Sequence, residues 1–151
     1  MADKLSLTRL GEEHLAAVAE LERLCFFEPW SENALRLLLQ DGAIGVVLLE
    51  NGDVVAYGGM TTVLDEGAVT NIAVHPNVRR RGYGRAVTAE LIRLAAERGI
   101  KNLFLEVRES NAAARALYRS LGFSECGVRK NFYRHPTESA VQMVFADTND
   151  E

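Results

Sequence analysis

The stretch from Ala68 to Val107 constrains the fold of this 151-residue chain more than any other part of the sequence. Ala68–His75 is β-rich, Tyr83–Arg98 carries apolar residues at helical spacing, and Ile100–Val107 is a dense apolar run that indicates a buried strand. Two strands joined by a helix in this way lie parallel, through a right-handed crossover. We therefore expect a βαβ unit at the centre of the sheet.

Asn51-Gly52 separates two further β-rich runs and is a strong hairpin signal, because both residues tolerate the positive φ of a tight turn. The sheet around the βαβ unit should therefore be mostly antiparallel. We predict an α/β (α+β) fold with a mixed sheet of roughly six to seven strands and about four flanking helices. The other expected strands are Leu5–Thr8, Ala43–Glu50, Asp53–Leu64, Phe123–Arg129 and Val141–Asp147, the last two joined around His135-Pro136, and the other expected helices are Glu12–Leu24, Ser31–Gln40 and Asn111–Leu121.

The composition indicates one globular domain over residues 1–151, because 48% of the residues are apolar, 25% are charged and no Pro/Gly/Ser-rich linker interrupts the chain. Only Asp147–Glu151 looks too polar to pack. The longest apolar stretch, Gly42–Leu49, is too short for a membrane helix, and Met1–Leu10 lacks the apolar core of a signal peptide. We expect a cytoplasmic protein, a monomer or weak dimer, with no membrane partner.

The net charge of −4 disfavours nucleic acid as a partner, so any binding of an anion must depend on local groups. Cys25 and Cys126 lie far apart and form no Cys-x-x-Cys pair, and the three histidines are widely separated. This pattern predicts neither a disulfide framework nor a metal site. A cysteine nucleophile is disfavoured too, since no local signature accompanies either thiol.

The loop between the expected strand and helix, Arg79-Arg80-Arg81-Gly82-Tyr83-Gly84-Arg85, has the composition of a phosphate-binding site. Glycines let the backbone approach a ligand, and the start of the helix offers unpaired N–H groups at the positive end of its dipole. The arginines can add bidentate phosphate contacts, with Arg79 and Arg85 as first candidates. A solvated basic turn before a helix is the plain alternative.

A nucleotide-binding Rossmann site is the rival interpretation, because strand, glycine loop, helix and strand follow in order and Glu106 lies where a ribose ligand would. Three features argue against it. Val87 stands at the third glycine position, the glycines lie seven residues beyond the end of the strand, and the preceding chain is an antiparallel meander. The loop also lacks the Gly-Lys-Ser/Thr ending of a P-loop.

Two side chains after the loop can carry acid–base chemistry. Glu106 follows Leu103–Leu105 at the end of the expected central strand, an apolar setting suited to a general base, although a strand-end carboxylate in solvent is the alternative. Tyr118 falls on the next helix, twelve residues later. It can serve as an acid or simply as a core residue with a satisfied hydroxyl.

The glycine loop resembles the cofactor motif of the Gcn5-related N-acetyltransferases, Arg/Gln-x-x-Gly-x-Gly/Ala after the fourth strand, at Arg79, Gly82 and Gly84. The resemblance implies acetyl-coenzyme A (acetyl-CoA) as co-substrate. It also implies that the backbone of the loop, which includes Arg80, Arg81, Tyr83 and Arg85, holds the coenzyme A pyrophosphate. The end of the preceding strand, Ile72-Ala73-Val74, would then take the pantetheine and polarise the thioester carbonyl.

Leu105–Arg108, Ser110–Ala114 and Ala116–Tyr118 further resemble the ribosomal-protein alanine N-acetyltransferase branch of that family. This resemblance implies Glu106 as the base, Tyr118 as the acid and Asn111 as a cofactor ligand. It extends to Glu28–Ser31 and Arg129–Tyr133, which line the acceptor side in the branch. Trp30 and Tyr133 are therefore the expected acceptor contacts, although Trp30 can also be an aromatic plug before a helix.

One stretch departs from the branch: Arg134–Ser139 looks shorter than the corresponding loop and places Ser139 where an Asp is typical. The expected reaction is direct transfer of acetyl from acetyl-CoA to a protein N-terminal amine, that of a small-subunit ribosomal protein, without metal and without an acetyl-enzyme. A small-molecule amine such as a polyamine or aminoglycoside is the alternative acceptor. A non-catalytic coenzyme A-binding module is the alternative from another class.

Overall fold

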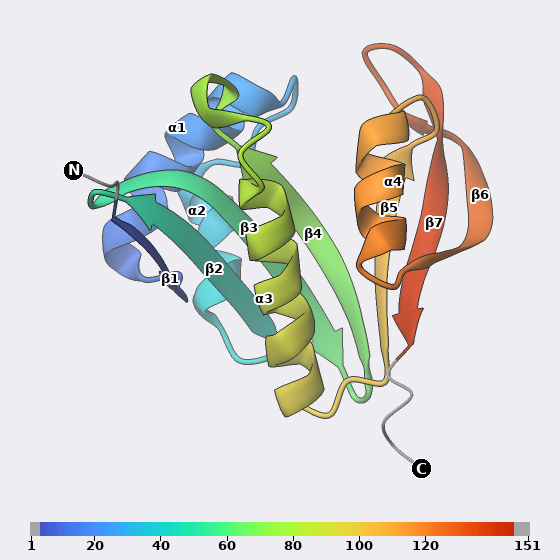
Figure 1. The fold of residues 1–151 in the computed structure, drawn as a ribbon, viewed down its shortest axis with the longest axis horizontal. Helices are drawn as coiled ribbons and strands as arrows, with labels where there is room; N and C mark the ends of the chain where they lie inside the picture. Colours follow the sequence, from blue (N-terminus) through green and yellow to red (C-terminus); the bar gives the residue numbers. More distant parts are fainter. Residues whose placement is uncertain (1–3, 147–151) are drawn as a thin grey trace.

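A twisted sheet of seven strands runs through residues 4–146, the part of the chain that the structure, a computed structural model, describes (Figure 1). The strand order is β1-β2-β3-β4-β5-β7-β6, so the mixed, mostly antiparallel sheet predicted from the sequence is confirmed. The expected polar tail Asp147–Glu151 lies outside the described residues. The strands are β1 (Leu5–Arg9), β2 (Ala43–Glu50), β3 (Asp53–Val63), β4 (Glu66–Val74), β5 (Asn102–Arg108), β6 (Ser124–Tyr133) and β7 (Glu138–Ala146).

The helices cover both faces of the sheet. They are α1 (Leu15–Cys25), α2 (Glu32–Leu35), α3 (Tyr83–Glu97) and α4 (Ala112–Ser120), with 3-10 turns at Glu12–His14, Arg36–Leu39 and Pro76–Val78. The expected continuous helix Ser31–Gln40 is wrong, because the chain tightens into a 3-10 turn after α2. The expected cap is confirmed, since the Ser31 hydroxyl accepts a hydrogen bond from the Ala34 N–H at 3.2 Å.

Alternating side chains of the strands build two cores, one on each face of the sheet. In β2, Ile44 and Val46 pack with Leu91 of α3 in one core, whereas Val47 packs with Leu15 of α1 in the other. Gly58 of β3 lets α3 lie close to the sheet, since a Cβ there would stand 2.6 Å from a methyl group of Val87. The two cores fix α1 and α3 on opposite faces of the same strands.

Strands β4 and β5 form the predicted parallel pair, but only at one end. Their pairing covers Glu66–Ala68 with Asn102–Phe104 and stops there. β5 pairs with β7 over the whole length of β5. Strands β5, β7 and β6 therefore form a part of the sheet that diverges from β4 (Figure 1). A bulge between β3 and β4 adds to this divergence, because Thr70 has no partner in the register.

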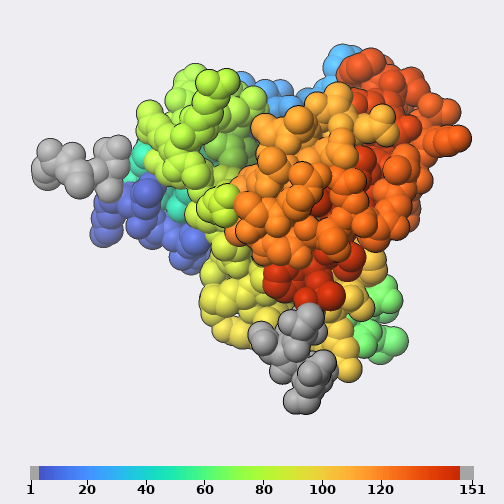
Figure 2. All heavy atoms as spheres, turned by 45° about the vertical axis from the view of Figure 1, so that its right-hand side comes forward, coloured from blue at the N-terminus to red at the C-terminus, as the bar shows by residue number. Residues whose placement is uncertain are grey.

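The turns between the elements largely follow the expected chemistry. Asn51 and Gly52 both adopt positive φ in the β2–β3 hairpin, and Gly99 does so after α3. The final hairpin turns at His135-Pro136, as predicted, through a cis peptide bond. The start of α3 and the end of α4 meet on one face of the molecule (Figure 2), where Arg85 donates a hydrogen bond to the Ser120 hydroxyl at 2.7 Å.

Candidate active site

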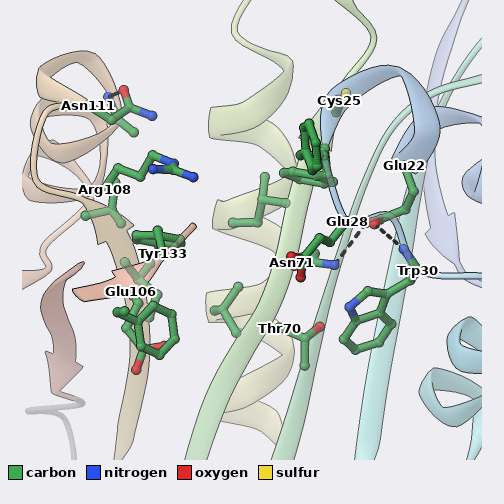
Figure 3. A pocket seen from close by; sticks show the side chains of 18 of the residues that line it. Glu22, Cys25, Glu28, Trp30, Thr70, Asn71, Glu106, Arg108, Asn111 and Tyr133 are labelled. Atoms are coloured by element: carbon green, nitrogen blue, oxygen red, sulfur yellow. Dashed lines mark hydrogen bonds between the residues drawn. The ribbon is translucent and has the colours of Figure 1, made fainter. Parts of the chain in front are cut away.

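A cavity of about 650 Å³ lies between the diverging strands β4 and β5 (Figure 3). One wall is formed by β5, α4 and the β6–β7 hairpin. The other is formed by β4, the end of α1 and the loop that leads to α2. Six of the residues singled out in the sequence line this cavity together: Trp30, Ile72, Glu106, Asn111, Tyr118 and Tyr133.

Glu106 points into the cavity because of the alternation of β5, in which Leu105 and Val107 face the core and Glu106 faces the opposite way. The expected apolar setting of its carboxylate is wrong. The side chain remains 25% exposed, and the Arg129 Nε lies 3.7 Å from its Oε1. The carboxylate is thus an accessible hydrogen-bond acceptor with a cation on its outer side.

Tyr118 and Asn111 reach the cavity from α4. The Tyr118 ring lies edge-on to Phe123, with centroids 5.9 Å apart, and burial raises the pKa of its phenol above the ordinary value. A phenol in this state keeps its proton at neutral pH and can donate it. Asn111 caps α4 by accepting a hydrogen bond from the Ala114 N–H at 3.1 Å, which leaves its amide NH₂ to face a ligand.

Trp30 and Tyr133 stand on opposite walls (Figure 3). The Arg108 guanidinium lies over the Tyr133 ring, 4.6 Å from its centroid, while also pairing with Glu138 at 3.2 Å. Burial, and after it the charge of Glu106, raises the pKa of Tyr133 to about 12. Hydrogen bonds from Ser110 hold the pKa of Glu138 below its usual range, so this carboxylate stays charged and keeps Arg108 in place.

The glycine loop lies outside the cavity lining, at the start of α3. Gly82 occupies the N-cap of α3 with φ +82°, and no side chain caps the helix there. A Cβ added to Gly82 would meet nothing within 4 Å, so the space beside the helix start is open. An open, uncapped helix N-terminus fits the pyrophosphate of coenzyme A, because its N–H groups and dipole favour an anion.

The arginines of the loop largely contact the protein. Arg79 donates to the Val74 carbonyl at 3.3 Å, Arg81 lies 3.7 Å from Glu50, and Arg85 bonds to Ser120. The Tyr83 side chain is buried, with its hydroxyl hydrogen-bonded to Glu50. For Tyr83, therefore, only the backbone amide is available to a cofactor.

The end of β4 contributes mainly backbone as well. Ile72 lines the cavity with its side chain, whereas Ala73 is buried in the core on the α1 face and Val74 packs against the opposite core. The Val74 carbonyl also accepts a hydrogen bond from the Cys25 thiol at 3.4 Å, and burial raises the pKa of that thiol. A neutral thiol of this kind is a poor nucleophile.

Several residues of the cavity were not predicted from the sequence, above all Glu22 and Asn71. Glu22 has 0% exposure and receives hydrogen bonds from Trp30, Tyr57 and Asn71. A signal was present, because Glu22 falls on the apolar face of α1, four residues after Val18 and seven after Leu15. A carboxylate at a core position demands a partner. Asn71 had no comparable signal.

Within residues 4–146, no group of three or more His, Cys, Asp or Glu side chains is placed to hold a metal ion. The helices of this same part of the chain are all too short or too polar to span a membrane.

The fold and the cavity agree with a known family. Residues 15–123 match the model of the Acetyltransferase (GNAT) family, which is the Gcn5-related family expected from the glycine loop. The chain belongs to this family of N-acetyltransferases, enzymes that use acetyl-CoA.

The relatives within the family are more specific. The chain is 40% identical over 128 residues to the [ribosomal protein bS18]-alanine N-acetyltransferase of Escherichia coli strain K12, covering 85% of this chain and 86% of the relative. It is 38% identical to the enzyme of the same description from Haemophilus influenzae, covering 83% and 87%. The crystal structure of the ribosomal-protein-S18-alanine N-acetyltransferase from Escherichia coli superposes with a TM-score of 0.89 at 37% identity, covering 95% and 94%.

Proposed function

We propose that this protein transfers the acetyl group of acetyl-CoA to the N-terminal α-amine of a protein, with the N-terminal alanine of ribosomal protein bS18 as its acceptor. The 40% identity to the Escherichia coli enzyme over 85% of the chain carries this proposal. The cavity supports it, because the parted strands bring Glu106 and Tyr118 to one space that opens to solvent. A ribosomal acceptor places the reaction in the cytoplasm.

The chain holds the acetyl donor through backbone groups. The amides at the start of α3, with Gly82 and Gly84 clearing the approach, take the pyrophosphate, and the parted end of β4 at Ile72–Val74 takes the pantetheine. Asn111 contributes its side-chain amide from the start of α4. When bound, acetyl-CoA supplies the activated acetyl thioester; the residues of the chain supply orientation and proton transfer.

Glu106 acts as the general base. It removes a proton from the acceptor ammonium, directly or through one water, and the free amine then attacks the thioester carbonyl. The new C–N bond forms as the C–S bond breaks, and Tyr118 gives its proton to the departing thiolate. The acetylated nitrogen then loses its extra proton, which returns through water to Tyr118, and Glu106 releases its proton to solvent. The transfer is direct, so no acetyl-enzyme is formed. The raised pKa of Tyr118 suits this role, because the phenol keeps its proton until the thiolate appears.

The acceptor enters between Trp30 on one wall and Tyr133 on the other. Above these residues the loop after α1 and the β6–β7 hairpin touch, since the Phe27 ring stacks on His135 with centroids 3.8 Å apart. His135 Nε2 also lies 3.6 Å from the Glu28 carboxylate. These two contacts join the walls of the cavity at one place and narrow the space open to an acceptor, which suits the narrow end of a polypeptide.

The test is an acetylation assay with peptides that carry the bS18 N-terminus, other N-termini and a blocked N-terminus, beside a panel of polyamines and aminoglycosides. We expect turnover with the free N-terminal alanine peptide and none with the blocked one. Turnover with the small amines alone would replace the proposed acceptor. Binding of acetyl-CoA without turnover of any amine would show a non-catalytic binding module.

A further inference from the structure

Glu22 lines the inner end of the cavity from the last turn of α1 with 0% exposure, and the proposed proton transfers do not involve it. Its Oε1 accepts a hydrogen bond from the Trp30 N–H at 2.9 Å. Its Oε2 accepts from the Asn71 side-chain amide at 2.9 Å (Figure 3). The same oxygen accepts from the Tyr57 hydroxyl. One carboxylate thus ties together the loop after α1, strand β3 and strand β4.

These contacts matter for the acceptor because two of the three partners belong to the cavity wall. Trp30 is the proposed acceptor contact, and Asn71 lies directly after the bulge residue Thr70, three residues beyond Ala68, where the pairing of β4 with β5 stops. Among the described hydrogen bonds, Glu22 is the side chain that bonds to both Trp30 and Asn71. The Cys25 thiol joins α1 to β4 further along the strand, at the Val74 carbonyl, so Glu22 is the link at the level of Asn71.

The charge of Glu22 points to the same role. A carboxylate with 0% exposure is costly to bury unless its oxygens are hydrogen-bonded, and here both oxygens face donors, an arrangement that suits the ionised form. All three donors are uncharged, so they satisfy the oxygens without cancelling the negative charge. By contrast, Arg129 already lies 3.7 Å from Glu106 on the opposite wall. A cationic amine in the cavity thus has an unneutralised carboxylate behind one wall.

We propose that Glu22 is a positioning residue for the amine acceptor: it holds Trp30 and Asn71 in the acceptor wall and places a buried negative charge behind them. It does not touch the acceptor, because it is fully buried. This inference rests on the proposed function and adds a determinant of acceptor affinity that is separate from the proton transfer by Glu106.

The test compares Glu22→Gln with Glu20→Gln, which removes the same charge from an exposed position two residues earlier on α1. We expect Glu22→Gln to raise the KM for the acceptor peptide about fivefold or more, because a hydrogen-bonded charge is lost, with kcat and the KM for acetyl-CoA changed less than about twofold. Glu20→Gln should leave all three constants unchanged. Asn71→Ala should raise the acceptor KM less than Glu22→Gln.

Three outcomes would overturn the inference: an unchanged acceptor KM in Glu22→Gln, an equal rise in the KM for acetyl-CoA, or a fall in kcat alone. If Glu22→Gln does not fold, Asn71→Ala and Tyr57→Phe decide, since each removes one donor and keeps the carboxylate. An unchanged acceptor KM in both then rejects the role. Failure of the proposed function is distinct, because the wild-type protein would itself acetylate no peptide.

Discussion

Glu106 and Tyr118 on one wall of the cavity come from consecutive elements, β5 and α4, whereas the opposite wall joins Glu22 of α1 to Asn71 of β4, 49 residues apart in the chain. The carboxylates on the two walls, Glu106 and Glu22, also differ in their surroundings. Glu106 is partly exposed and faces Arg129, while Glu22 is buried among uncharged donors. The wall with Glu106 and Tyr118, called the local wall below, presents groups that can exchange protons. The wall with Glu22 and Asn71 presents a fixed shape and a fixed charge.

This difference predicts that the two sets of residues affect different kinetic constants. Residues on β5 and α4 should control the rate of the chemical step, and residues on α1 and β4 should control the affinity for the acceptor. Substitutions in these two sets of residues are expected to separate in kcat and KM, which gives the comparison a direct test.

The largest effect is expected from Glu106→Gln. The amide cannot take the proton of the acceptor ammonium, so kcat at neutral pH should fall about 100-fold or more. The loss should shrink at high pH, where more of the acceptor amine is already neutral, and calorimetry should show nearly unchanged binding of acetyl-CoA. A pH–rate profile identical to that of the wild-type protein would contradict the assignment of Glu106 as base.

Tyr118→Phe should follow, with kcat reduced about 10- to 100-fold, because the thiolate leaves without an acid. The pKa of the Tyr118 phenol is raised above the ordinary tyrosine value of 10.0, so the wild-type phenol keeps its proton up to that pH. The kcat of the wild-type protein should therefore not fall through loss of this proton below pH 10.0. Tyr133→Phe is the matched control, which should change the acceptor KM more than kcat. Equal kcat in wild-type protein and Tyr118→Phe would remove the acid from the mechanism.

Gly82→Ala tests the glycine loop at the start of α3, which belongs to neither wall of the cavity. A residue other than glycine at φ +82° is strained by about 1–2 kcal/mol, so binding of acetyl-CoA should weaken about tenfold. Gly99→Ala is the matched control, since Gly99 has φ +81° just beyond the other end of α3 and an added Cβ would likewise meet nothing within 4 Å. Its affinity should stay within about twofold of the wild type. Equal losses in both variants, measured by calorimetry, would show that φ at Gly82 is not the cause.

Arg129→Gln should have the smallest effect, less than about threefold in kcat, because an ion pair this exposed contributes little. Lys130→Gln removes a charge from the neighbouring exposed position and serves as its control. A fall in kcat as large as that of Glu106→Gln would show that Arg129 belongs to the proton-transfer machinery. The contrast between the accessible Glu106 and the buried, fully hydrogen-bonded Glu22 would then be wrong.

Much of the local wall could be predicted from the sequence. The sequence located Glu106 at the end of β5 and Tyr118 on α4, and the structure has both in the lining of the cavity. The surroundings of Glu106 could not be predicted, because Arg129 comes from β6 and reaches it only through the pairing of β5, β7 and β6. The helix expected at Ser31–Gln40 failed for a similar reason, since packing against β2 and β3 favours a tighter turn there.

The sequence by itself determined the order of the elements, the hairpin at Asn51-Gly52, the uncapped glycine start of α3 and the residues able to move protons. These depend on φ preferences and on side-chain periodicity, which act over a few residues. Only the tertiary structure decided where the β4–β5 pairing stops and that Glu22 meets Asn71 and Trp30. Those contacts join segments far apart in the chain, and their positions follow from how two cores pack on opposite faces of one sheet.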